Sequence, residues 1–132
     1  MKITARLENS LNTNHVIVDT NGTSQQLSIN SKSAGYGSSI NGGELLCAAL
    51  ATCFCNDIYR EAQKKNIVIT KVSVEASAEF AGPGEAGYNI CYKAKVEGDA
   101  SAEELTDLIK HTDKVAEIHN TLRAGVKVSL VE

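Results

Sequence analysis

The stretch from Asn41 to Cys55 constrains the fold more than any other part of the chain. It reads Asn-Gly-Gly-Glu-Leu-Leu-Cys-Ala-Ala-Leu-Ala-Thr-Cys-Phe-Cys, and the apolar character continues to Ile58 before charged residues begin. This pattern predicts a helix from Glu44 to about Lys65, with a buried first half and a solvated second half. A helix that is apolar on all sides needs cover on all sides. We therefore expect a partner subunit to supply part of that cover.

The same predicted helix carries three thiols, at Cys47, Cys53 and Cys55. A cysteine reacts through its thiolate, which forms in water with a pKa of about 8.5 unless positive charge or a helix N-terminus stabilises it. Cys53 lies roughly three turns into the helix, beyond the reach of the helix dipole, so any activation must come from tertiary neighbours. The alternative for each thiol is the role of a small buried hydrophobe.

Length and charge restrict the class of protein. The 132 residues, 42% of them hydrophobic, suffice for one core, so we expect a single domain over residues 1–132. The formal net charge is −3, and no basic cluster exceeds the Lys64–Lys65 pair, which argues against nucleic-acid or anionic-membrane partners. No apolar run approaches the roughly 20 residues of a membrane span, and no signal segment is apparent. We expect a cytoplasmic protein with free thiols.

Turn signals and periodicity predict the remaining elements. Period-two alternation predicts strands at 2–8, 15–20 and 26–29, a hairpin of long strands at 71–80 and 88–96, and a closing strand at 126–131. Ser101 to Glu104 has the capping-box form and predicts a second helix to about residue 112, with a short helical turn over 115–121. The order β-β-β-α-β-β-α-β predicts an α+β protein.

The element order and the segment Glu44–Phe54 resemble the OsmC/Ohr family, whose members carry a Leu-Leu-x-Ala-Ala-x-x-x-Cys stretch on a central helix. His119-Asn-Thr-Leu-Arg-Ala-Gly-Val-Lys-Val is similar to the family's terminal Cys-Pro-Val-His/Ser-Asn-Thr-Leu segment and the strand that follows it. The likeness covers nearly the whole chain. It implies an OsmC/Ohr-like fold that forms an intertwined homodimer around two long central helices, with no cofactor.

The best-known activity of that family is the thiol-dependent reduction of hydroperoxides. A peroxidatic thiolate becomes a sulfenic acid, which a second cysteine captures as a disulfide, while an arginine and a glutamate hold the first thiolate. Carried over by position, the first cysteine is Cys53 and the glutamate falls on Gly43, so the adjacent Glu44 is the candidate acid. Arg6 is the N-terminal candidate for the arginine. The second cysteine falls on Ala116. The resemblance therefore implies reduction of organic hydroperoxides with an external thiol as resolving partner.

Several alternatives stay open. Cys47, Cys55 and Cys91 are the thiols within the chain that are available to resolve a sulfenic acid. A second possible function is that of a non-catalytic dimer that binds an apolar small molecule at the subunit interface. Tyr36 and Ile40, in the Gly/Ser-rich loop over 30–43, are candidates for the mouth of such a pocket.

His119 and Arg123 have competing roles. His119 could act as a base, or as a metal ligand together with Cys53, but the chain lacks Cys-x-x-Cys and His-x-x-x-His spacing. Capping of a short helix or turn is the simpler role for His119. Arg123 could reach the pocket of Cys53 in place of Arg6.

Overall fold

A computed structural model describes all 132 residues and shows the predicted α+β class. The chain separates into two compact units, residues 1–45 and 46–132. Each unit contains its own antiparallel sheet, of three strands in the first and two in the second.

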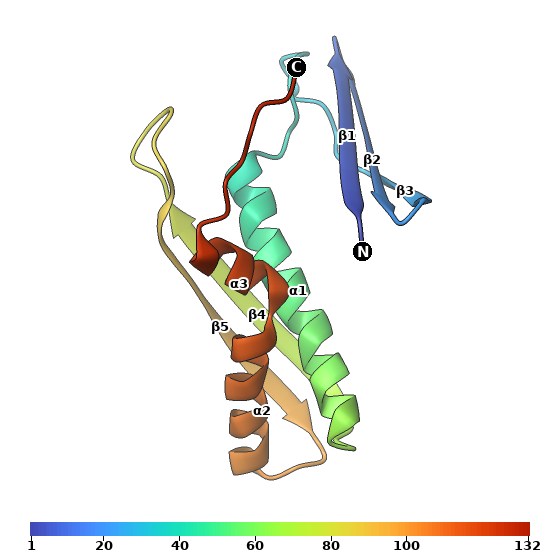
Figure 1. The fold of residues 1–132 in the computed structure, drawn as a ribbon. Coiled ribbons are helices and arrows are strands. Elements are labelled where there is room, and N and C mark those ends of the chain that lie inside the picture. Colours follow the sequence, from blue (N-terminus) through green and yellow to red (C-terminus); the bar gives the residue numbers. More distant parts are fainter. The chain divides into compact units, whose positions relative to one another are not determined.

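The first unit is a three-stranded meander, drawn in blue in Figure 1. It consists of β1 (Ile3–Ser10), β2 (Thr13–Thr20) and β3 (Thr23–Leu27), in the spatial order β1-β2-β3. Asn21 and Gly22 both have positive φ, at 52° and 88°, as a two-residue hairpin turn requires. The predicted strands are confirmed. The third begins earlier than predicted because this turn is so tight.

Helix α1 runs from Gly42 to Lys64 and confirms the predicted long helix. Its start is fixed by a reciprocal cap. The Asn41 side chain accepts from the Glu44 backbone N–H at 2.8 Å, and the Glu44 carboxylate accepts from the Asn41 backbone N–H at 2.8 Å. This arrangement satisfies two of the amides that a helix start leaves unpaired.

The burial of α1 within one chain agrees only in part with the prediction. Buried residues occur in the apolar part from Leu50 to Ile58, burial continues to Ala62, and Leu45, Ala48 and Ala49 at the start of the helix are exposed. The second half packs on other elements and buries charged groups by pairing them, which the apolar pattern alone did not indicate. The buried residues are Leu50, Phe54, Asp57, Ile58, Glu61 and Ala62.

The second unit packs its helices on one face of a long hairpin, β4 (Ile69–Glu79) and β5 (Tyr88–Gly98) (Figure 1). The strands are antiparallel, with Val74 opposite Ala94. Alternate residues face the helices, so one face of the hairpin is apolar and the other is polar. The core consists of Phe54, Ile58, Ala62, Leu108 and Ala116, with Ile67, Ile69, Val72, Val74, Tyr92, Ala94, Val96 and Ile109 packed against it.

Two consecutive helices follow the hairpin. In α2 (Ala102–Val115) the predicted capping box is present, because Ser101 Oγ accepts from the Glu104 N–H and the Glu104 carboxylate accepts from the Ser101 N–H. Only Ala116 separates α2 from α3 (Glu117–Ala124). Helix α3 ends at Gly125, whose φ of 63° is the left-handed conformation that glycine adopts at helix ends.

The closing strand predicted at 126–131 is not formed within this chain. The segment carries no regular structure, and Val128 and Leu130 are 94% and 98% exposed. A strand needs a neighbouring backbone with which to pair, and this segment pairs with none here.

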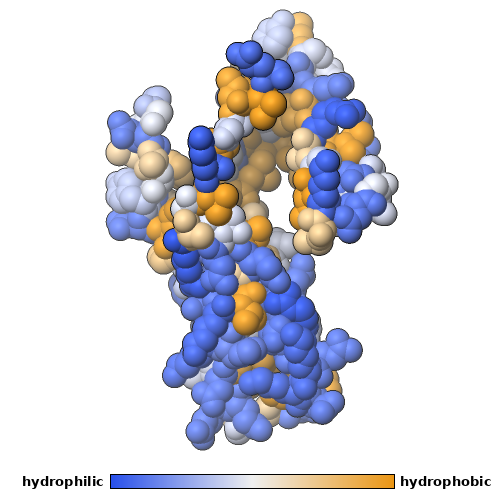
Figure 2. Space-filling view, viewed as in Figure 1, coloured by the Kyte–Doolittle hydropathy of each residue, from blue (hydrophilic) through white to orange (hydrophobic).

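Hydrophilic residues cover α2 and the second half of α1 in Figure 2. None of the helices combines the length and apolar character that a membrane crossing requires.

Candidate functional site

Cys53 is partly buried on α1, and its sulfur lies between two carboxylates. The thiol donates to Asp57 Oδ2 at 3.3 Å and lies 3.9 Å from Glu117 Oε2. Asp57 is one turn further along α1, and Glu117 is the first residue of α3. The backbone N–H of Ile118, in the first turn of α3, also hydrogen-bonds to the sulfur. The sulfur therefore contacts both an anionic pair and a helix N-terminus.

These neighbours act on the thiol pKa in opposite directions. Burial, the largest effect, raises the pKa of Cys53, while the Ile118 N–H lowers it. The hydrogen bond to Asp57 and the negative charges of Asp57 and Glu117 raise it further, because they favour the protonated thiol and repel a thiolate. The net shift is upward. At neutral pH Cys53 is a thiol that is hydrogen-bonded to Asp57.

Arg60 joins the two carboxylates at the sulfur. Its Nη1 lies 2.8 Å from Asp57 Oδ1 and 2.8 Å from Glu117 Oε1. The guanidinium reduces the negative charge around Cys53, although its contacts are with the carboxylates and not with the sulfur. Arg60 therefore influences the thiol through its two anionic neighbours.

Glu61 holds Arg60 in place. Its side chain is 4% exposed and accepts from Arg60 Nε at 2.8 Å, from Lys64 Nζ at 2.9 Å and from His111 Nε2 at 3.0 Å. The hydrogen bond from Arg60 is the largest of the effects that lower the pKa of Glu61 to about 2. Because His111 lies on α2, this buried carboxylate also links the two long helices.

The residues implied by the family resemblance are divided between the two units. Cys53 lies in the second unit, whereas Arg6, on β1 opposite Ile17, and Glu44 lie in the first. The Glu44 carboxylate accepts from the backbone at the start of α1. Within its own unit, Cys53 is brought together with Asp57, Glu117 and Ile118.

Ala116, the position of the family's second cysteine, is completely buried at the junction of α2 and α3. The two residues that follow it, Glu117 and Ile118, both contact the Cys53 sulfur. The segment that aligns with the region of the family's second cysteine therefore lies beside Cys53. At the position of that cysteine it carries the methyl group of Ala116 and not a thiol. No disulfide is formed, and all four cysteines are free.

Sequence reasoning missed Asp57, Arg60 and Glu117. Helical spacing could have identified the first two, since Asp57 lies four residues after Cys53 and Arg60 three residues after Asp57, on one helix face. Glu117 gives no such signal, because it reaches the sulfur only through the packing of α3 against α1.

The ligand atoms of Cys53, Asp57 and Glu117 all lie within 4.8 Å of one another, a spacing that could hold a metal ion. Arg60 already forms ion pairs with both carboxylates, and its single positive charge offsets one of their two negative charges. His119, considered as a co-ligand of Cys53, does not belong to this group.

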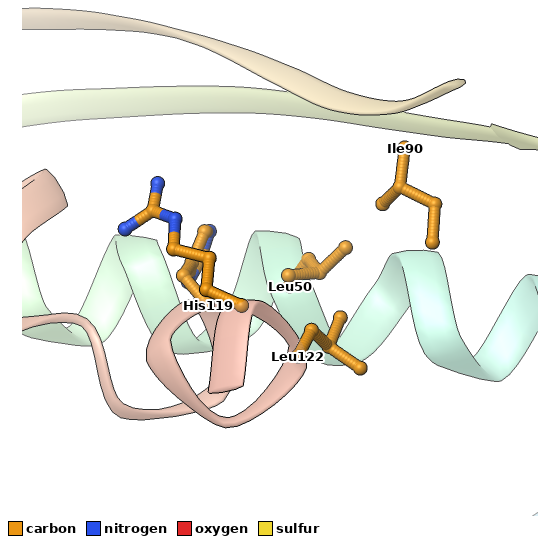
Figure 3. A pocket seen from close by; sticks show the side chains of 5 residues that line it. Leu50, Ile90, His119 and Leu122 are labelled. Atoms are coloured by element: carbon orange, nitrogen blue, oxygen red, sulfur yellow. The ribbon is translucent and has the colours of Figure 1, made fainter. Parts of the chain in front are cut away.

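A pocket of about 240 Å³ lies beside α3. Its apolar walls come from three elements, and their side chains converge in Figure 3. Beneath them the His119 ring packs edge-on against Tyr92, with ring centroids 4.5 Å apart, and against Phe54 at 5.7 Å. Neither ring nitrogen of His119 has a hydrogen-bond partner. The residues that line the pocket are Leu50, Ile90, His119, Leu122 and Arg123.

Solved structures share this fold. An OsmC-like protein from Mycoplasma pneumoniae is 22% identical, with 99% of this chain and 96% of that chain covered and a TM-score of 0.63. An organic hydroperoxide resistance protein OsmC from Legionella pneumophila is 23% identical, with coverages of 98% and 95% and a TM-score of 0.64. The organic hydroperoxide resistance protein OhrB of Bacillus subtilis is 22% identical, with coverages of 98% and 94% and a TM-score of 0.54.

A comparison with curated proteins gave no match. The sequence model of the family described as "OsmC-like protein" matches residues 35–131, which include Cys53 and every residue that contacts its sulfur. The chain therefore belongs to the OsmC-like protein family.

Proposed function

We propose that the protein reduces organic hydroperoxides through Cys53, with an external thiol as the resolving partner. Family membership and the names of the Legionella and Bacillus structures support a role in peroxide resistance. The observation that carries the proposal is the arrangement at the sulfur. A partly buried thiol donates to a carboxylate that can accept its proton, and it contacts a helix-terminal amide that can stabilise the resulting anion.

In the first step Asp57 accepts the proton of the Cys53 thiol. The thiolate attacks one peroxide oxygen, the O–O bond breaks, and the other oxygen leaves as an alkoxide that takes up a proton to become an alcohol. The sulfur, oxidised by two electrons, is now a sulfenic acid. The Ile118 N–H stabilises the thiolate before attack, and Arg60 offsets the charge of the neighbouring carboxylates.

The second half of the cycle needs thiols from outside the chain, because Ala116 stands where the family's second cysteine would be. One external thiol condenses with the sulfenic acid, which releases water and leaves a mixed disulfide. A second thiol reduces this mixed disulfide and regenerates the Cys53 thiol. Each peroxide therefore consumes two external thiols, and the chain's other cysteines are not required.

Arg60 and Arg6 are two candidates for the helper arginine. The resemblance favours Arg6, together with Glu44, whereas the contacts within the second unit favour Arg60. We propose Arg60 as the positioning residue, since it binds both carboxylates at the sulfur. Replacement of Arg60 by alanine should then lower the rate of peroxide reduction more than Arg6→Ala, and the opposite order would transfer the role to Arg6.

The test of the proposed activity is the intact mass of the protein after one equivalent of cumene hydroperoxide. We expect the addition of one oxygen, which a sulfenic-acid trap converts to an adduct on Cys53. Turnover with an added dithiol should disappear in Cys53→Ser and persist in Cys47→Ser, Cys55→Ser and Cys91→Ser. Full turnover by the Cys53→Ser protein would refute the proposal.

A second function is favoured by the raised pKa of Cys53 and by the buried methyl group at Ala116. In this case the protein is a non-catalytic member of the family whose pocket holds an apolar small molecule, and its thiol is inert. A protein that takes up no oxygen from stoichiometric peroxide, and that co-purifies with a small molecule, would support this second function.

A further inference from the structure

The two carboxylates at Cys53 differ in how far they face solvent. The Asp57 side chain is only 6% exposed, whereas the Glu117 side chain is 61% exposed. Glu117 Oε2 lies 3.9 Å from the sulfur of the partly buried Cys53. A molecule from solvent that reacts at this sulfur therefore comes close to the exposed carboxylate of Glu117.

The orientation of the carboxylates leaves their negative charge next to the sulfur. Arg60 Nη1 contacts Asp57 Oδ1 and Glu117 Oε1, each at 2.8 Å. The other oxygen of each group, Asp57 Oδ2 or Glu117 Oε2, is the one recorded next to the Cys53 sulfur. The sulfur thus contacts the two negative groups directly, and the positive group contacts only these carboxylates.

The charges of the wider cluster do not cancel. Glu61 adds a third carboxylate and Lys64 a second permanent cation. When the His111 ring is neutral, three carboxylates face two cations and one net negative charge remains. Burial is the largest of the effects that raise the pKa of Cys53, and the negative charges of its two neighbouring carboxylates raise it further. The sulfur therefore lies in a negative potential.

We propose that Glu117 selects the reactants of Cys53 by charge, and that it favours cationic and uncharged molecules over anionic ones. The selection applies to the hydroperoxide and to the resolving thiol, because both bring their reacting atom to the same sulfur. One unit charge about 6 Å from another in water changes a rate roughly threefold, so a cation and an anion of similar shape differ roughly tenfold at low salt. The proposal rests on Cys53 as the reacting group of the proposed function.

The experiment compares how fast Cys53 reacts with two methanethiosulfonates of opposite charge, which carry a trimethylammonioethyl or a sulfonatoethyl group. Cys47→Ser, Cys55→Ser and Cys91→Ser leave one thiol. Its thiolate displaces methanesulfinate and forms a mixed disulfide. Each rate is divided by the rate with free 2-mercaptoethanol. The same thiolate attacks both reagents, so the ratio of their rates does not depend on the pKa of Cys53.

We expect the cationic reagent to be favoured roughly tenfold in about 10 mM salt and roughly threefold in about 150 mM salt. Glu117→Gln removes the charge, so it should bring the ratio to within about twofold of one. Glu117→Asp keeps the charge and should keep the preference. Glu85→Gln, in the exposed turn between β4 and β5, is the matched control and should react as the parent does. A parent ratio near one, no reaction with either reagent, or an unchanged ratio in folded Glu117→Gln would each overturn the proposal.

Peroxide turnover gives a second readout. We expect kcat/KM for cumene hydroperoxide to exceed that for its para-carboxylate derivative roughly threefold, and Glu117→Gln to remove most of the difference. The thiosulfonate reactions need only an accessible thiol. A charge preference in them without any peroxide turnover would refute the proposed function and support selection by Glu117, whereas turnover without a charge preference would refute the selection alone.

Discussion

In addition to burial, the two carboxylates beside Cys53 raise the pKa of its thiol. This effect of the carboxylates could not be inferred from the position of Cys53 on α1. A thiol three turns into a helix was expected to depend on tertiary neighbours, and the groups that touch the sulfur are Asp57, Glu117 and the Ile118 amide. The Arg60 guanidinium contacts these two carboxylates and not the sulfur itself. Protonation of Cys53 is therefore governed by the balance between burial, two anions and one helix terminus.

This balance predicts that loss of the Asp57 charge increases the thiolate fraction of Cys53, which the rate of alkylation measures, although the same change removes the proton acceptor proposed for peroxide reduction. Asp57→Asn removes an anion that favours the thiol, so the pKa of Cys53 should fall and alkylation by iodoacetamide at pH 7 should accelerate roughly three- to tenfold. The rate is measured across pH in a protein whose other cysteines are replaced. Asp107→Asn, on the exposed face of α2, is the control. A slower reaction in Asp57→Asn would contradict the proposed balance.

A second prediction concerns Glu61 and acid stability. The folded pKa of Glu61, about 2, lies below the ordinary carboxyl value of about 4.3. Its ion pairs therefore contribute stability that is present above the unfolded pKa and is lost as the pH falls through the folded value. We expect the free energy of unfolding to decrease between pH 5 and pH 2, and Glu61→Gln to remove about 1–3 kcal/mol at pH 7. Denaturant titrations at several pH values measure both effects.

The control for Glu61 is Glu97→Gln on the exposed face of β5. This variant should unfold as the parent does at every pH, because no ion pair in the structure involves Glu97. If Glu61→Gln and the parent lost the same stability between pH 5 and pH 2, the acid sensitivity would have to come from other carboxylates.

At the scale of elements, local signals identified most of the structure and failed where a partner element was needed. The capping box at Ser101 and the turn at Asn21–Gly22 act within a few residues, so the sequence alone predicted α2 and the first sheet. The burial of α1 and the state of 126–131 depend on what packs against them. Glu117 was missed for the same reason, because tertiary packing brings α3 to Cys53.

The start of α2 offers a test at this scale. Ser101→Ala removes the side-chain oxygen that accepts from the Glu104 N–H, and it should destabilise the protein by about 1 kcal/mol. Ser73→Ala, on the exposed face of β4, replaces the same residue type without removing a helix cap and should change stability little. Chemical denaturation compares the two variants. Equal effects would mean that the cap contributes nothing beyond the properties of an exposed serine.

At the scale of the whole molecule, apolar surface remains uncovered in a single chain. Leu45, in the first half of α1, is 37% exposed, and the segment 126–131 presents Val126, Val128 and Leu130 at alternate positions, all largely exposed. Apolar residues at alternate positions on an unpaired segment suit a strand that pairs with another backbone. We propose that a second copy of the chain provides this pairing and the missing cover for α1.

Sedimentation velocity tests this assembly directly, and we expect the parent protein to sediment as a dimer. Leu130→Lys places a charge among the alternate apolar residues, so it should shift the protein toward the monomer and lower its melting temperature. Ser129→Lys adds the same charge at the intervening position, which would face away from a paired apolar surface, and it should leave the dimer intact. If both variants remained dimeric, the segment 126–131 would lie outside the interface, and a parent protein that sedimented as a monomer would refute the dimer itself.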